Sequence, residues 1–496
     1  MKKLTALMMA AALALAASAD ADVKLGTLLV TDQAGLVKAT AQLAGLAGNP
    51  MLGVMASTSI ASFPVYKHFG PMRENSQMLF VAYGEALEDD FDDIEGAVLY
   101  PPQRTKIAFM AEHPGCYEKD GVIVIEERNA TAAGDDDDDD DDDDDSSVKR
   151  TYTAFSEDGQ WATMSNDKDA ALRALGEVAQ ATAPLNGEIA RLTVFKDVFQ
   201  SLSVAIGKGL QHETNERKKA TMTQLKDRVS MIDTVTVGLK ITEAGGEISG
   251  TFVPVAGTEL ATVGREPLAA APLAFAPAQA IFAAASAKGS GERKFDATQY
   301  GALVALLEKH GVMSDYCTCA FADDAANMTI DIAKAIAFFK GPGAEKASVI
   351  DPESFVEEMG TIFNSADQTP IAEQAGGAIS LTLANHPAAV APETKFNALF
   401  PEAASLQPFT VSVGSYYELV KALAAEAVPE APEEIRPTIT TILSTLPPAG
   451  NAAIANVYYR SGDAILFTSR ISVDELRGIG AIVNAAVGFV TAQMMN

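Results

Sequence analysis

The 496-residue sequence lacks the motifs on which common catalytic sites depend. The five histidines are scattered, with no HExxH or His-x-His spacing. There is no GxSxG nucleophile motif, no phosphate-binding GxxxxGK[ST] and no dinucleotide-binding GxGxxG. The single tryptophan, Trp161, offers little surface for stacking against sugars. We therefore expect no enzymatic activity, no catalytic residue, no metal and no cofactor.

Cysteine is also scarce, and three residues are too few for a disulfide scaffold. An odd number leaves at least one of Cys116, Cys317 and Cys319 unpaired within a monomer. Cys317 and Cys319 are two residues apart, so an extended strand would place both thiols on one side. A zinc site would need further ligands, and His310, the nearest histidine in sequence, has no partner at metal-binding spacing. One disulfide, free thiols, or a metal or redox role remain open.

Basic residues are outnumbered by acidic ones, and the formal net charge is −29. An acidic surface repels phosphate backbones and anionic membranes, which excludes nucleic acid as a partner. The aspartate run at residues 135–145 has no apolar side chains to bury, so we expect a disordered surface loop there. The alternatives are diffuse binding of divalent cations such as calcium and docking to a mineral surface or a basic partner. Residues 88–96 are acidic too, but they lack the spacing of an EF-hand and predict a solvated segment.

The amino terminus has the pattern of a secretory signal peptide. Lys2 and Lys3 precede a short apolar run, and residues 17–19 read Ala-Ser-Ala, a typical cleavage site. The run is shorter than the roughly 20 residues of a spanning helix, and no later segment is apolar enough, so we expect no transmembrane anchor. Residues 1–19 thus predict a periplasmic or extracellular protein.

Two patterns recur along the chain. Residues 152–176, 239–264 and 457–480 each predict a β-hairpin followed by a helix. Residues 28–39 and 411–422 each predict a strand followed by a helix, with Asp32 or Ser415 as the N-cap, and residues 191–202 follow this pattern more loosely. Further strands are expected at residues 78–84, 105–111 and 121–127.

These units predict an α+β fold with mainly antiparallel sheets and helices packed on one face. We expect two related halves, residues 20–265 and 266–496, separated near a segment rich in alanine and proline. The signal peptide, the low aromatic content and the repeated units resemble bacterial exported proteins of unknown function with an internally duplicated α+β body. That resemblance implies a non-enzymatic envelope component and assigns no functional residues.

The sequence therefore favours a binding or structural protein that holds a lipid, a peptide or a partner protein on a concave sheet face. Two alternatives remain. One is a hydrolase with a carboxylate pair that a single sequence does not reveal. The other is a calcium-dependent surface protein acting through residues 135–145. The sequence predicts neither the identity of the ligand nor the oligomeric state.

Overall fold

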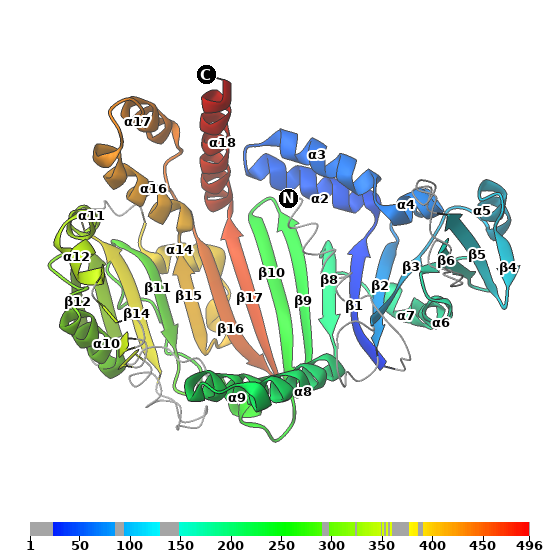
Figure 1. Cartoon of the computed structure of the whole chain (residues 1–496), viewed down its shortest axis with the longest axis horizontal. Coiled ribbons are helices and arrows are strands. Elements are labelled where there is room, and N and C mark those ends of the chain that lie inside the picture. Colours follow the sequence, from blue (N-terminus) through cyan, green and yellow to red (C-terminus); the bar gives the residue numbers. More distant parts are fainter. Residues whose placement is uncertain are drawn as a thin grey trace, which may run out of the picture. The chain divides into compact units, whose positions relative to one another are not determined.

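Figure 1 shows the helices and strands of the protein in a computed structural model. The chain divides into two compact units. Unit 1 is Met1–Ala41 with Met51–Lys240, and unit 2 is Gln42–Pro50 with Ile241–Asn496. The structure describes residues 23–84, 94–128, 148–289, 297–322, 325–348, 350–351, 354–355, 358–359, 376–384 and 390–495. The predicted signal peptide, the aspartate run and most of residues 88–96 lie outside these ranges. The boundary at 265/266 remains a prediction, and residues 241–265 lie in unit 2.

The strands of unit 1 form a fully antiparallel sheet in the order β9–β8–β1–β2–β3–β7–β6–β5–β4. These strands are β1 (Val23–Thr31), β2 (Gln77–Gly84), β3 (Ile94–Tyr100), β4 (Tyr117–Lys119), β5 (Val122–Arg128), β6 (Val148–Phe155), β7 (Ala162–Ser165), β8 (Ala190–Val194) and β9 (Ile232–Thr242). The helices between them are α2 (Gln33–Leu46), α3 (Pro50–Ala61), α4 (Pro64–Phe69), α5 (Lys106–Glu112), α6 (Lys168–Ala174), α7 (Val178–Ala181), α8 (Lys196–His212) and α9 (Glu216–Ser230).

Helices cover both faces of this sheet, so the prediction of a single covered face is wrong for unit 1. Leu79 and Leu99 pack against α6 and α7 on one face. Met78 and Tyr100, their neighbours in sequence, point to the other face and pack against α4 and α5. The reason lies in the sequence of β2, where consecutive residues are apolar and both faces therefore have to be buried.

The strands of unit 2 are ordered β10–β17–β16–β15–β11–β14–β13–β12, and among their described pairings only that of β13 with β14 is parallel. Its strands are β10 (Gly245–Pro254), β11 (Ala280–Ser286), β12 (Cys317–Ala322), β13 (Ala325–Ile330), β14 (Gly377–Leu383), β15 (Thr410–Gly414), β16 (Ile454–Ser461) and β17 (Ala464–Ser472). Its main helices are α10 (Ala297–Lys309), α11 (Ile332–Lys340), α12 (Pro342–Ser348), α14 (Pro392–Leu399), α15 (Ala403–Leu406), α16 (Tyr416–Ala427), α17 (Arg436–Thr445) and α18 (Val473–Met495). Phe396 and Phe400, at the end of α14, pack on small residues of β11, β15 and β16.

The α+β class and the mainly antiparallel pairing are confirmed, with 42% helix and 30% strand. The N-caps are confirmed as well, because the amide of Gly35 donates to Asp32 Oδ1 at 2.7 Å and that of Glu418 to Ser415 Oγ at 3.0 Å. The strand expected at residues 105–111 is wrong. Thr105 caps a helix there, α5, which buries only Phe109. The relation between the two halves stays a prediction.

The three predicted hairpin units differ in the helix that follows. Residues 152–176 form β6, β7 and the short helix α6, whereas residues 457–480 form β16, β17 and the start of α18. Residues 239–264 contain β10, after which only a four-residue 3-10 helix, Glu259–Thr262, follows.

Candidate functional site

A row of six apolar side chains crosses unit 1 on one face of its sheet. Successive members lie directly opposite one another on neighbouring strands, so they share that face. Each of them is half-buried. We call this set the central row: Val237 on β9, Leu192 on β8, Leu28 on β1, Phe80 on β2, Val98 on β3 and Met164 on β7.

The rows on either side of the central row are covered. Val30 lies two residues after Leu28 on β1, and its partner Met78 lies two residues before Phe80 on β2. Both are buried beneath α4. In the other direction Gly26 and Ala82 are buried, and Val198 of α8 packs against Ala82. Four members of the central row, Leu28, Phe80, Val98 and Met164, pack against the cluster that α4 and α5 cover, whereas Leu192 and Val237 belong to no core cluster of the described residues. Figure 1 shows α4 and α8 beside these strands.

The end of the row on β8 and β9 is the most open. Among the described residues of these two strands, only Ala190 belongs to a core cluster. Every residue of β9 except the buried Gly238 is half-buried or, at Thr242, exposed. Leu192 and Val237 therefore pack in none of the buried apolar clusters of the described residues, and their aliphatic side chains stay partly exposed.

The opposite face of the same strands is polar. Thr27, Thr193 and Thr236 lie opposite one another across β1, β8 and β9. The hydroxyl groups of Thr193 and Thr236 are 3.4 Å apart and form a hydrogen bond. The alternation of threonine and arginine with leucine and valine thus gives β8 and β9 one polar face and one apolar face.

The central row ends at a buried polar contact on β6. Thr153, opposite Met164, forms a 2.8 Å hydrogen bond with Nε2 of His68 on α4. Burial lowers the pKa of His68 to about 4, and the nearby His113 adds to this effect. His68 is therefore neutral near pH 7, and no titratable side chain belongs to the row itself. Such a surface can bind apolar matter but offers no group for acid–base or nucleophilic chemistry.

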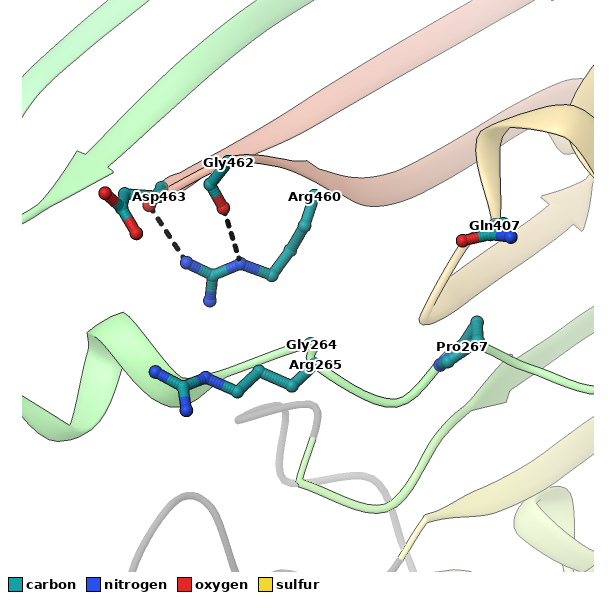
Figure 2. Close-up of a pocket in the computed structure, with 7 residues that line it drawn as sticks. All are labelled: Gly264, Arg265, Pro267, Gln407, Arg460, Gly462 and Asp463. Atoms are coloured by element: carbon teal, nitrogen blue, oxygen red, sulfur yellow. Dashed lines mark hydrogen bonds between the residues drawn. The ribbon is translucent and has the colours of Figure 1, made fainter.

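A second candidate is a polar pocket of about 340 Å³ in unit 2 (Figure 2). The guanidinium of Arg460 donates to the carbonyl oxygens of Ala261 at 3.0 Å and Asp463 at 2.9 Å. It donates to those of Val263 and Gly462 as well. Burial lowers the pKa of Arg460, and the charge of Arg265 adds to this effect. The seven lining residues are Gly264, Arg265, Pro267, Gln407, Arg460, Gly462 and Asp463.

Most of the N–H groups of Arg460 are therefore used to tie the β16–β17 turn to the segment before Gly264. Arg265 is exposed and lies on the other side of the pocket in Figure 2. This arrangement stabilises the turn. It leaves Arg460 few donors for a bound anion.

Two carboxylates meet at the edge of β3 in unit 1. Burial and, after it, the charge of Asp167 together raise the pKa of Glu95 to about 7. Both groups have local partners, however. Asp167 accepts the amide N–H of Ala170 at 2.6 Å as the N-cap of α6, and Glu95 accepts from Arg173 at 3.2 Å. The pair is the nearest approach to the carboxylate site of a hydrolase, and its partners give it a role in anchoring α6.

The most deeply buried charges lie in unit 2. Lys395 of α14 forms an ion pair with Glu418 of α16, and the two side chains are only 3% and 4% exposed. Glu475 of α18 accepts from the hydroxyl of Ser415 at 2.7 Å and from the amide of Tyr417 at 2.9 Å. These groups join three helices, and their donors and acceptors are used within the protein.

The part of the chain that the structure describes holds no group of three His, Cys, Asp or Glu residues suited to a metal ion. All three cysteines are free thiols, so the disulfide alternative is not realised. Cys116 lies in unit 1, where its Sγ is 3.8 Å from the carbonyl oxygen of Met110. Within the described ranges, no helix is both long and apolar enough to cross a membrane.

The sequence nominated no site residue, and the central row was missed. Its local signal was present, since residues 235–239 alternate valine with threonine and glycine before Leu239. The signal does not reveal that the apolar side of β9 lacks a covering helix, because that depends on distant elements. A search of family models, of curated proteins and of solved structures finds no match to this chain.

Proposed function

We propose that this protein is a non-enzymatic binding protein that holds the acyl chain of a lipid against the central row of unit 1. The observation that carries the proposal is the continuous run of six half-buried apolar side chains across neighbouring strands, of which Leu192 and Val237 pack in no core cluster of the described residues. Contiguous apolar surface left open on a folded protein marks interaction sites. The proposal places the protein outside the cytoplasm, as the predicted signal peptide suggests.

The direction of the row favours a lipid over a peptide. A bound peptide strand runs along a sheet edge and satisfies its backbone groups by pairing with that edge. The central row runs across the strands, on a face whose N–H and C=O groups are used within the sheet. A peptide lying there would leave buried backbone groups without partners, which costs free energy. An alkyl chain has no such groups.

The length of the row also suits an acyl chain. Neighbouring strands are about 4.8 Å apart, so the five intervals from β9 to β7 span about 24 Å. One lipid chain extends over half of a bilayer core that is about 30 Å thick, or about 15 Å. The row is therefore long enough for a full chain. Each methylene that it removes from water contributes about 0.8 kcal/mol.

The test is a titration of the purified mature protein with a fluorescent fatty acid. The test variant combines Leu192→Ser with Val237→Ser. The matched control combines Thr193→Ala with Thr236→Ala, on the same two strands but on the polar face. Removing two aliphatic contacts of about 1 kcal/mol each should weaken binding by about 10- to 50-fold. The control should bind like the wild type.

Organic extraction of the purified protein, followed by mass spectrometry, should also recover a lipid from the wild type and less from the test variant. Equal affinity in the wild type and both variants, or an equal loss in both variants, would overturn the assignment to the central row. Circular dichroism checks that both variants remain folded.

A further inference from the structure

Three sulfur-bearing side chains lie together on one face at the edge of the unit 2 sheet. Cys317 and Cys319 point to the same face of β12, where both are half-buried while Thr318 between them is exposed. Met328 on β13 lies directly opposite Cys319, so its thioether shares that face. Among the described strands β12 pairs with β13 alone, which leaves this cluster open at the sheet edge.

The strand geometry opposes a disulfide between the two cysteines. Residues two apart in a strand have Cα atoms about 6.6 Å apart, near the upper limit of about 6.8 Å for a disulfide. Closing the bond would therefore distort β12 and its pairing with β13. Both thiols are free in the structure. The sulfur atoms are nevertheless close enough for the Cys319 thiol to donate a hydrogen bond to Cys317.

We propose that Cys317, Cys319 and Met328 bind a soft monovalent cation, Cu(I), through two thiolates and one thioether. Thiolate and thioether donors select Cu(I), whereas a structural zinc site uses four ligands and an iron–sulfur cluster four cysteines. The long, unbranched side chain of Met328 can adjust its sulfur to the ion. Ile330 and Leu381 share this face and supply an apolar flank. Binding releases two thiol protons to solvent and transfers no electron.

This site departs from the expectation of no bound metal. The proposal is tested by titrating the reduced, purified protein with Cu(I) under anaerobic conditions, against a coloured Cu(I) chelator. We expect one ion per chain. Cys317→Ser and Cys319→Ser should each lower the affinity at least about 100-fold, because each removes a thiolate ligand. Met328→Leu, which keeps the volume of the side chain, should lower it about 10-fold.

Cys116→Ser is the matched control, since it removes the one thiol outside the cluster and should leave the affinity unchanged. Wild-type affinity in both the Cys317 and Cys319 variants would overturn the proposal. So would binding that depends on Cys116. A further outcome would also refute the metal site: the reduced chain does not bind Cu(I), but glutathione disulfide oxidises Cys317 and Cys319 to a disulfide and releases two equivalents of glutathione. The pair would then be a redox switch. Met328→Leu tests the site even if a serine variant fails to fold.

Discussion

Strands β2 and β3 belong to the same sheet as β8 and β9, yet the two regions are packed differently. Leu79 and Leu99 are fully buried, with α6 and α7 on their face and the α4 cluster on the other. On β8 and β9, Leu192 and Val237 remain half-exposed although their side chains are as apolar. The strands of both regions are paired through backbone hydrogen bonds, so strand pairing alone does not determine whether a side chain is buried.

Under the proposed function, stability and binding are placed on different strands of one sheet. Covered strands supply the buried area that offsets the entropy of folding. Open strands keep their apolar side chains available for another molecule, which then buries them. If this division holds, the same substitution should have unequal effects in the two regions.

The largest effect is expected from Leu99→Ala on β3. This fully buried side chain packs among Leu79, Trp161 and the α6 alanines, so its removal leaves a cavity. We expect a loss of about 2–5 kcal/mol in the free energy of unfolding. Denaturant unfolding monitored by circular dichroism measures it. A loss below about 1 kcal/mol would show that β3 is not covered as described.

Helix α4, which covers β2, carries His68, and this histidine should make the folded state less stable in acid. His68 has its pKa lowered from 6.5 to about 4, so the unfolded chain binds a proton that the folded chain rejects. Stability should therefore fall as the pH drops from about 6.5 towards 4, by at most about 3 kcal/mol. His68→Phe should reduce this slope in thermal unfolding scans at pH 7.5, 5.5 and 4.5. An unchanged slope would contradict the assignment of the pH dependence to His68.

Leu192→Ala repeats the Leu99 substitution in the open region. Because the side chain is only half-buried, about 1 kcal/mol of unfolding free energy should be lost. The same variant should bind the fluorescent fatty acid several-fold more weakly. Leu99→Ala should bind normally in conditions where it stays folded. A stability loss at Leu192 equal to that at Leu99 would remove the distinction between the two regions.

The smallest effect is expected from Thr193→Ala, on the polar face of β8. Its hydrogen bond to Thr236 is long, at 3.4 Å, and partly exposed. We expect a change in unfolding free energy within about 0.5 kcal/mol and unaltered fatty-acid binding. A clear loss of binding would indicate that the ligand contacts the threonine face of β8.

The elements with local signals were predictable. Asp32 and Ser415 each follow a strand and precede an apolar helical pattern, and both prove to be N-caps. Residues 105–111 show the limit of this approach. Their apolar content suggested a strand, but the hydroxyl of Thr105 accepts the amide N–H of Ala108 and starts a helix. A capping residue decided the structure where hydrophobic content did not.

The central row could not be predicted, because it depends on contacts between distant segments. Leu28 and Leu29 are neighbours in sequence and equally apolar, yet Leu29 is buried beneath α6 and α7 while Leu28 lies in the central row. Which of the two is covered depends on the register of β1 with β2 and β8 and on where α4 and α8 pack. The pairing of Cys319 with Met328 likewise requires the register of β12 on β13.

The parallel pairing of β13 with β14 bears on the order in which unit 2 assembles. Ile330 lies beside Leu383, which is 53 positions further along the chain. A short turn joins β16 to β17, and only two residues separate β12 from β13 in sequence, so these antiparallel pairings close with little loss of chain entropy. Contacts between residues far apart in sequence slow folding. We therefore expect hairpin β16–β17 to form before the β13–β14 pairing.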